Sequence, residues 1–283
     1  MIFRPNNAKY KLQVVATPIG NLNEITSRAL LVLQECECIL CEDTRVTLKL
    51  LSKFNIAKKE LISYQKFNEK TKLKLALNKI KTKKTILISD VGYPCISDPG
   101  YNLVDECYKS NIAIEIINGP SSIMHALVVS GLNLNNFYFN GFLPASKAQR
   151  INKLHELQTI NVPIVCFESV YRIKDALKDI DNIFNQPFLV VCRELTKINE
   201  TIYRGYYKDI INFIVEKGEF VIIIDKQLKK RINCSNKTII NLVSKTLKDT
   251  KLPLKKACKI VALQLDQPTS LIYNIYIQSQ RIK

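Results

Sequence analysis

The chain has 283 residues, of which 47% are hydrophobic, and its 42 Lys and Arg against 25 Asp and Glu give a net charge of +17. At about 150 residues per domain this length predicts two domains, and the apolar share fills two cores, which excludes a disordered chain. No apolar run reaches the ~18 residues of a membrane helix, and residues 1–7 lack the apolar core of a signal peptide. We therefore expect a cytoplasmic globular protein with no membrane partner.

The basic charge is concentrated in two segments. Lys and Asn are abundant, as in proteins of AT-rich genomes, so the net charge alone is weak evidence for a polyanionic partner. However, residues 53–84 hold eleven Lys and two Glu, and residues 226–259 hold eleven Lys or Arg and one Asp. A bias of composition alone should spread more evenly. The two segments favour RNA or another extended polyanion, with solvated helix faces as the alternative.

The first half of the chain alternates apolar strand-like runs with amphipathic helix-like runs. The predicted strands are residues 12–16, 38–41, 61–64, 85–89 and 113–117. The predicted helices are residues 25–34, 44–54, 69–81 and 102–109. Several strands are apolar on both faces, which indicates a mostly parallel α/β domain with helices on both sides of its sheet.

The second half resumes the alternation and ends in a different pattern. Further strands are predicted at residues 137–140, 162–167, 188–192 and 220–224. A lysine-rich connector, 226–236, then leads to helix-like runs at 237–247, 254–265 and 269–277. Glycine, proline and serine turns place a boundary near residue 119. The sequence thus predicts an α/β domain over 1–118, a second over 119–225, and a small helical module with a basic face over 226–283.

Residues 89–100 form the most informative motif. This stretch holds two Gly, two Pro, two Asp and two Ser directly after a predicted strand, where open α/β sheets bind ligands. Gly permits close backbone approach, Pro fixes the loop shape, and the aspartates can accept hydrogen bonds from hydroxyls or an amine. The turn at 17–21 also follows a strand. Neither the dinucleotide fingerprint nor a P-loop is present, which argues against NAD and ATP.

Acidic residues follow three other predicted strands, at 42–45, 168 and 194. Each has a structural alternative: Asp43 is a good helix N-cap, and Glu42 could merely pair with Arg45. Cys36, Cys38 and Cys41 include a C-x-x-C, but no second one completes a zinc site. The nine cysteines are an odd number spread through apolar stretches, so we expect reduced thiols and no bound metal. The two histidines are isolated, which disfavours a triad hydrolase.

The ordered series of motifs resembles the rRNA-modifying members of the tetrapyrrole methylase superfamily. The matching stretches are residues 14–22, 42–45, 89–90, 96–100, 119–121, 130–132, 141–144, 167–169, 172 and 193–197. Where the family has Ala-Gly-Thr-Pro-Gly, this chain has Val91-Gly92-Tyr93-Pro94-Cys95, and Val170-Tyr171 replaces Pro-His. The resemblance implies two α/β domains with S-adenosylmethionine in the cleft between them, a homodimer, and 2′-O-methylation of a cytidine in the decoding region of small-subunit (16S) rRNA.

Site residues are assigned to three roles. A ribose hydroxyl needs help in losing its proton, and the candidate catalytic groups are Asp43, Glu168, Glu194 and Lys197. The candidate cofactor-binding residues are Pro18, Ser89, Asp90, Val91, Gly92, Pro94, Ile96, Ser97, Asp98, Pro99, Gly100, Gly119, Pro120, Ser121, Ser122 and Phe167. The candidate RNA contacts are Arg45, Arg172, Arg193, Lys229, Lys230, Arg231, Lys255 and Lys256.

Two other functions remain open from the sequence. A methyltransferase acting on a carboxylated tetrapyrrole shares the fold, but a compact ligand does not explain two separate basic segments. A catalytically silent RNA-binding protein on the same scaffold is the other alternative. The expected partner is small-subunit rRNA or the assembled 30S subunit, and DNA is not expected.

Overall fold

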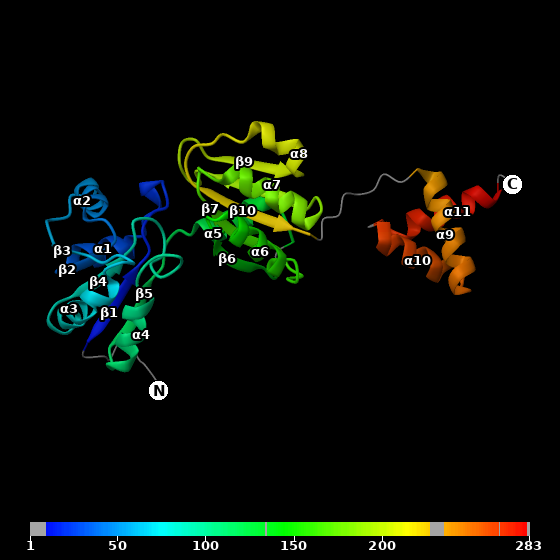
Figure 1. Ribbon diagram of the computed structural model, residues 1–283. Helices are drawn as coiled ribbons and strands as arrows, with labels where there is room; N and C mark the ends of the chain where they lie inside the picture. Colours follow the sequence, from blue (N-terminus) through cyan, green and yellow to red (C-terminus); the bar gives the residue numbers. More distant parts are fainter. Residues whose placement is uncertain (1–9, 134, 227–234, 266, 282–283) are drawn as a thin grey trace.

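The computed structural model describes residues 10–281, apart from residues 134, 227–234 and 266. Figure 1 shows two α/β domains, each built on one sheet, and a group of three helices towards the C-terminus. The predicted architecture of two α/β domains followed by a helical module is therefore confirmed. Within the described part of the chain, no helix is both long enough and apolar enough to cross a membrane.

The first α/β domain contains a sheet of five parallel strands in the order β3-β2-β4-β1-β5. The strands are β1 (Lys11–Val15), β2 (Cys38–Cys41), β3 (Glu60–Ser63), β4 (Thr85–Ile88) and β5 (Ala113–Ile117). The helices are α1 (Ser27–Glu35), α2 (Thr44–Lys53), α3 (Glu69–Thr82) and α4 (Tyr101–Lys109). Each predicted element of this half is present, with its ends within two residues of the expected positions.

Helices cover both faces of the first sheet. Leu33 of α1 and Leu51 of α2 belong to a buried cluster on one face, while Ile80 of α3 and Leu103 of α4 belong to a cluster on the other. Every residue of β2 and β4 is buried, which explains why these strands are apolar at successive positions rather than at alternate ones. The carboxyl ends of β1 and β4 lie side by side, so the loops that follow them meet at one edge.

The second α/β domain has a mixed sheet in the order β6-β7-β10-β8-β9. Its strands are β6 (Tyr138–Phe142), β7 (Ile164–Glu168), β8 (Phe188–Arg193), β9 (Thr201–Gly205) and β10 (Phe220–Asp225). Only β6 and β7 are parallel, whereas β10 runs antiparallel to both of its neighbours and β9 is antiparallel to β8. The expectation that the second half repeats the parallel pattern is wrong, and β9 was not predicted. Nearly every residue of β8 and β10 is buried, so these strands lack the apolar and polar alternation that is typical of antiparallel strands.

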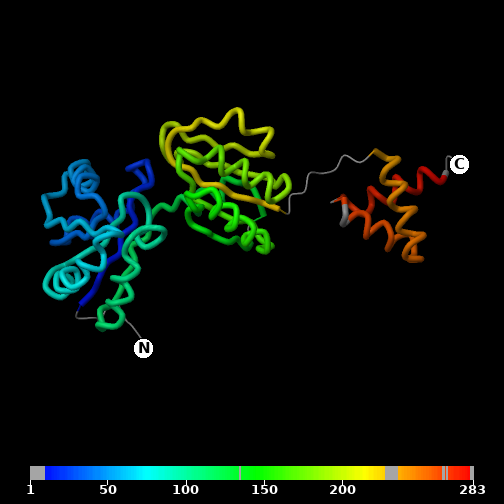
Figure 2. Tube along the Cα trace, viewed as in Figure 1, coloured from blue at the N-terminus to red at the C-terminus, as the bar shows by residue number. Residues whose placement is uncertain are grey.

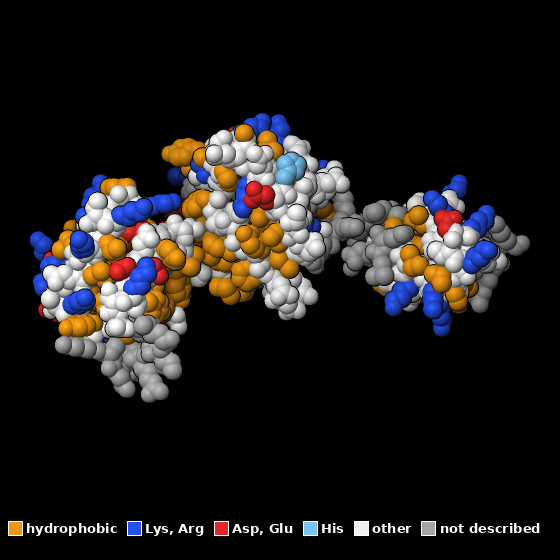
Figure 3. Space-filling view, turned by 60° about the horizontal axis from the view of Figure 1, so that its bottom comes forward, with side chains coloured by type: hydrophobic (Ala, Val, Ile, Leu, Met, Phe, Trp, Pro, Cys, Tyr) orange, Lys and Arg blue, Asp and Glu red, His pale blue; other side chains and the backbone are white. Residues whose placement is uncertain are grey.

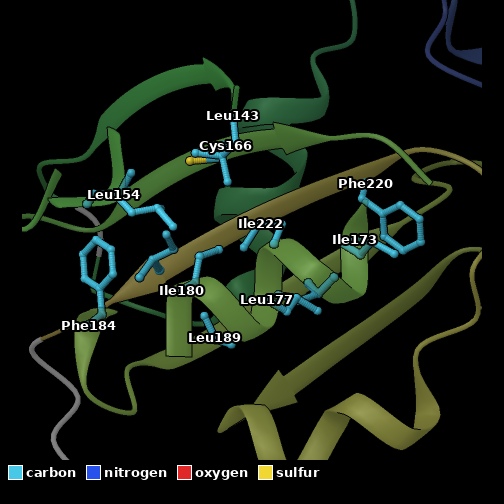
Figure 4. Packing of buried hydrophobic residues seen from close by; sticks show 14 of the residues in the cluster. Leu143, Leu154, Cys166, Ile173, Leu177, Ile180, Phe184, Leu189, Phe220 and Ile222 are labelled. Carbon is cyan, nitrogen blue, oxygen red and sulfur yellow. The ribbon is translucent and has the colours of Figure 1, made fainter. Parts of the chain in front are cut away.

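Alternate residues of β10 face two different cores. Phe220 and Ile222 pack with α6 (Lys147–Leu157) and α7 (Ile173–Phe184), as Figure 4 shows. Val221 and Ile223 pack on the other face with α5 (Ser122–Ser130). This second core also contains Ile19, from the turn after β1, so it joins the two α/β domains. Short helices η2 (Leu22–Glu24), α8 (Tyr207–Ile210) and η3 (Ile211–Phe213) complete the two domains.

The C-terminal module consists of α9 (Asn236–Thr250), α10 (Leu254–Leu265) and α11 (Thr269–Arg281). The three helices pack on one another around a cluster that includes Val243, Val261 and Ile272 and no residue of the α/β domains. Figure 2 shows the module as a separate body at the red end of the trace. It therefore has a core of its own.

Candidate active site

A cavity with a volume of about 660 Å³ lies where the two α/β domains meet. This volume falls in the range of small-molecule and cofactor sites, ~300–1,000 Å³. The first domain contributes the loop after β4, and the second contributes α5, β6 and the end of β7. The lining residues predicted for the cofactor are Val91, Gly92, Ile96, Ser97, Asp98, Ser121, Ser122 and Phe167. The cleft expected from the resemblance is thus formed largely by the expected loops.

The loop after β4 is held in an unusual backbone conformation. Ser97 and Cys95 have φ of 68° and 71°, and Gly100 has φ of 131°. Non-glycine residues with positive φ are strained and gather at functional sites. The family pattern has Gly where this chain has Cys95, and the positive φ gives the physical reason for a glycine there. A Cβ on Gly100 would come within 2.6 Å of Cys95 Sγ, so the side chain of Cys95 fills the space that Gly100 leaves open.

Backbone and side-chain hydrogen bonds connect this loop to the neighbouring turns. Thr17 and Gly92 exchange two backbone hydrogen bonds of 2.9 and 3.2 Å between the turns after β1 and β4. Tyr93, which replaces the Thr of the family pattern, accepts a hydrogen bond from Gly119 N at 3.1 Å. The bulkier side chain therefore connects the loop after β4 to the turn after β5.

The two α/β domains also touch beside the cavity. Asn21 N donates to Thr196 Oγ1 at 2.9 Å, and a Cβ on Gly20 would lie 2.5 Å from Lys197 Cγ. Only glycine permits this approach between the turn after β1 and the loop after β8. The close contact fixes one edge of the cavity.

Glu168 is the candidate catalytic residue that lines the cavity. It ends β7 and is 2% exposed. Its Oε1 accepts from Ser169 N at 2.7 Å and pairs with Arg172 at 2.6 Å. Its Oε2 has no hydrogen-bond partner among the described residues, and the same holds for Ser169 Oγ. Buried polar atoms without partners are rare, so unsatisfied hydrogen-bonding groups lie just beneath this end of the cavity.

Asp98 gives the cavity a second carboxyl group. Burial, reinforced by the nearby charges of Glu42 and Asp90, raises the pKa of Asp98 to about 7. Hydrogen bonding from Ser89 acts in the opposite direction. A carboxyl with this pKa changes its charge within the physiological range, and a cation bound nearby would favour its ionised form.

The other three candidate bases do not line the cavity and are held in ion pairs. Asp43 caps α2 and pairs with Arg45, whose hydrogen bonds lower the pKa of Asp43 to about 2. Arg45 thus pairs with Asp43 and not with Glu42, contrary to the structural alternative considered from the sequence. Burial acts to raise the pKa of Glu194, but hydrogen bonds from Lys197 and the backbone of Glu219 lower it overall.

Lys197 is a poor candidate for a neutral base in this arrangement. Burial acts to lower its pKa, but hydrogen bonds of 2.9 Å to Glu194 and Glu219 outweigh burial and raise the pKa above its usual value. The ammonium group therefore stays charged. Its observed role is to connect Glu194 to Glu219, a cavity residue.

The remaining cofactor candidates fall into two groups. Pro18, Ser89 and Asp90 line a smaller neighbouring cavity. Those that line neither cavity are Pro94, Pro99, Gly100, Gly119 and Pro120, which belong to the turns that shape the walls.

One predicted RNA contact is wrong. Arg193 is 6% exposed and donates to the backbone oxygens of Lys217 and Asn199, so its guanidinium holds loops together and cannot reach a phosphate. Arg172 is partly exposed beside Glu168, whereas the side chain of Arg45 is 86% exposed. Lys255 and Lys256 are exposed on α10. Lys229, Lys230 and Arg231 lie outside the described residues.

Several cavity residues were missed by the sequence interpretation. The walls include Ile19, Met124, Phe139, Phe142 and Glu219. Phe139 and Phe142 both pack against Phe167, with ring centroids 5.1 and 5.4 Å apart. The aromatic spacing of residues 137–142 was a usable signal, but nothing in the sequence distinguishes Glu219 from a surface glutamate. Among the described residues, no group of His, Cys, Asp or Glu has the geometry of a metal site.

Comparison with known proteins identifies the family. Residues 11–211 match the family model described as Tetrapyrrole (Corrin/Porphyrin) Methylases. Ribosomal RNA small subunit methyltransferase I of Mycoplasma genitalium is 38% identical over 95% of this chain and 99% of that relative. The protein of the same name from Thermotoga maritima is 43% identical over 76% of this chain and 97% of that relative.

Solved structures share the fold at lower identity. A diphthine synthase superposes with a TM-score of 0.62 at 14% identity, covering 77% of this chain and 91% of that one. The cobalamin biosynthetic enzyme cobalt precorrin-4 methyltransferase superposes with a TM-score of 0.54 at 18% identity, covering 80% of this chain and 98% of that one. On the strength of the family model and the near full-length relatives, the chain belongs to the tetrapyrrole methylase family and, within it, to the ribosomal RNA small subunit methyltransferases I.

Proposed function

We propose that this protein transfers a methyl group from S-adenosylmethionine to the 2′-hydroxyl of a cytidine in the decoding region of small-subunit (16S) rRNA. The observation that carries the proposal is the cavity between the two α/β domains, with the buried carboxylate of Glu168 in its wall. Family membership supplies the reaction class and the cofactor.

The cavity is suited to S-adenosylmethionine, which supplies an electrophilic methyl group on a sulfonium when it is bound. Its volume is adequate, and its walls combine apolar side chains for a flat base with polar groups for a ribose and an amino acid moiety. Asp98 is acidic, which in its ionised form matches the positive charge of the sulfonium and of the amino group. Ser121, Ser122 and the backbone of the 89–100 loop offer further hydrogen-bonding groups.

Glu168 is the best placed of the candidate bases. Its Oε1 is held by Arg172 and by Ser169 N, whereas Oε2 is buried without a hydrogen-bond partner. We propose that a small movement of this side chain on substrate binding lets Oε2 accept a proton or a hydrogen bond from a ribose hydroxyl. Asp43 and Glu194 have depressed pKa values and make ion pairs outside the cavity. Methyl transfer from a sulfonium is an in-line displacement, so alignment of donor and acceptor supplies much of the remaining rate enhancement.

The substrate is a polyanion, and exposed cations are available for it. Lysines and arginines project from the first α/β domain and from the helical module in Figure 3. Phosphate contacts of this kind position RNA without selecting a base. We propose that the protein acts in the cytoplasm on rRNA or on the assembled 30S subunit.

We also propose that two copies of this chain form a homodimer. Several large apolar side chains of the second α/β domain are exposed, including Val128 at 78%, Tyr171 at 90% and Ile198 at 103%. Burial of such side chains against a second copy would remove apolar surface from water. Light scattering of the purified chain tests this proposal, because a monomer at micromolar concentration would contradict it.

Methyl transfer from labelled S-adenosylmethionine to small subunits that lack the modification tests the proposed function. The wild-type protein is expected to label the rRNA at a ribose, and Glu168→Gln is expected to slow single-turnover transfer at least ~100-fold. Cofactor affinity should change little, because the amide keeps the shape of the side chain. Glu216→Gln, at an exposed ion pair with Lys174, is the matched control. Labelling of a porphyrinogen in place of rRNA would contradict the proposed function. Methyl transfer by Glu168→Gln at the wild-type rate would exclude Glu168 as the general base.

A further inference from the structure

A second, smaller cavity of about 160 Å³ lies beside the candidate cofactor cavity, against α2. Its space corresponds to roughly five water molecules at ~30 Å³ each, so it admits a single flat ring but not a whole nucleoside cofactor. Its apolar walls are formed by Pro18, Leu22, Val46, Leu50 and Ile88. Its polar lining comes from Thr17, Thr47, Lys49, Ser89 and Asp90.

The two cavities share a wall. Pro18 lines the smaller cavity and Ile19 the larger one, and in the same way Asp90 and Val91 lie on opposite sides. The paired backbone hydrogen bonds between Thr17 and Gly92 fix this partition. The two cavities are therefore adjacent along the turns after β1 and β4.

Asp90 gives the smaller cavity a directional acceptor. Its Oδ1 accepts a hydrogen bond from Asp43 N at 3.0 Å, which orients the carboxylate. No described residue donates to its other oxygen, so Oδ2 is available to a ligand. A carboxylate accepts from the exocyclic amino group of cytosine and repels the O4 oxygen that uracil has at the same position.

Basic side chains line the exposed face of α2 next to this cavity. Arg45, Lys49 and Lys53 are spaced four residues apart and are all exposed, so they form one basic stripe on the helix. Lys49 also lines the cavity. Such a stripe matches the phosphates of a single RNA strand whose base has been turned out of its stack.

From this geometry we propose that the smaller cavity binds the cytosine base of the acceptor nucleotide, with Asp90 accepting from its amino group and the α2 stripe holding the adjacent phosphates. The inference rests on the proposed function, since it assigns the substrate base to that reaction. It makes Asp90 a determinant of cytidine over uridine.

The experiment measures methyl transfer to 30S subunits assembled with either cytidine or uridine at the acceptor position. The wild-type protein is expected to prefer cytidine in kcat/KM by at least about tenfold. Asp90→Asn keeps an oxygen for Asp43 N and places an amide donor at the other position, so the preference should fall by about tenfold or reverse. Asp105→Asn, at an exposed ion pair on α4, is the matched control and should keep the wild-type preference.

A second pair of variants tests the cavity without touching its charge. Val46→Phe fills the space from α2 and is expected to lower kcat/KM for the cytidine subunit at least about tenfold, while affinity for S-adenosylmethionine stays within about twofold. Leu48→Phe enlarges an exposed neighbour on the same helix that lines neither cavity, and it should behave as wild type.

The outcomes separate the inference from the proposed function. An unchanged preference in Asp90→Asn, or full activity in Val46→Phe, overturns the base-binding role while methylation by the wild-type protein persists. A loss of cofactor affinity in Asp90→Asn with the cytidine preference intact assigns Asp90 to the cofactor and also overturns the inference. Absence of transfer by the wild-type protein to either subunit contradicts the proposed function itself.

Discussion

The buried carboxyl group of Asp98 makes the stability of the folded protein depend on pH. Its pKa is raised from the ordinary value of 3.8 to about 7, so between these pH values the folded chain holds a proton that the unfolded chain has lost. Stability that depends on the neutral form is therefore lost as the pH rises through this window. We expect Asp98→Asn to unfold at a higher temperature than the wild type at pH 8 and at a similar temperature at pH 4. Thermal unfolding across this range measures the difference, and an equal gap at every pH would contradict the assignment.

Ionised Asp98 lowers the stability of the free protein, but we expect it to strengthen binding of the cationic cofactor. S-adenosylmethionine is cationic, and an ionised Asp98 in the cavity wall can accept a charge-assisted hydrogen bond from it. We expect Asp98→Ala to weaken cofactor binding at least ~10-fold, which corresponds to about 1.4 kcal/mol. Titration calorimetry at pH 8 measures this effect. A folded variant with wild-type affinity would exclude Asp98 from the cofactor site.

Residue types could be predicted from the sequence, but their pairings could not. In the sequence, Asp43, Glu168, Glu194 and Lys197 each follow a predicted strand of one or the other α/β domain, which indicates catalytic candidates but not their partners. Only the fold reveals that all four make ion pairs, and that Glu168, the one of them that lines the cavity, has a buried oxygen without a hydrogen-bond partner. Arg193 was misassigned for the same reason, since exposure depends on which loops fold over a side chain.

At the scale of elements, α3 and α4 are connected through Glu69. Glu69 is 6% exposed at the start of α3 and accepts from Gly100 N at 3.0 Å and from Asn102 at 3.2 and 3.0 Å. Gly100 closes the loop that contains Asp98. Glu69 is therefore a positioning residue for this cavity wall, although it lies outside every motif that the sequence singled out.

We expect Glu69→Gln to raise the KM for S-adenosylmethionine about tenfold and to leave kcat nearly unchanged. An amide replaces one of the two accepting oxygens by a donor, so the loop loses a charge-assisted hydrogen bond while the chemistry of the reacting groups stays the same. Steady-state kinetics with saturating 30S subunits separates the two constants. Glu35→Gln, with a side chain that is 66% exposed, is the control. An equal fall of kcat and kcat/KM would indicate a role other than positioning.

Strand direction marks the limit of prediction for the elements. The first sheet was predicted closely because each apolar run alternates with an amphipathic helix, and such alternation favours parallel strands. In the second sheet β8, β9 and β10 are antiparallel, yet β8 and β10 are buried on both faces and look like parallel strands in the sequence. The position and direction of β10 between β7 and β8 depend on pairing between strands that are far apart in the sequence. Local hydrophobic patterns carry no information on such pairing.

At the scale of the whole molecule, the catalytic cavity and the basic module are built independently. The cavity is formed by the two α/β domains alone, and the module has its own core around Val261. Dividing the chain after residues 118 and 225 is consistent with these cores and remains a proposal. The charge of the module is therefore available for a task other than building the cavity.

That task is expected to be RNA binding through phosphates. Lys255, Lys256 and Lys259 are exposed on α10, opposite the buried Ala257, Cys258 and Val261. We expect replacement of the three lysines by Gln to weaken RNA binding and to reduce the slope of log affinity against log salt by about 0.7–0.9 for each phosphate that the variant no longer neutralises. Affinity for S-adenosylmethionine should not change, because none of the three lysines lines the cavity.

The control variant replaces three exposed lysines of the second α/β domain together, namely Lys147, Lys178 and Lys208. Filter binding to 30S subunits at several salt concentrations measures both quantities, and equal slopes for the wild type and the α10 variant would leave residues 53–84 as the main RNA-binding segment.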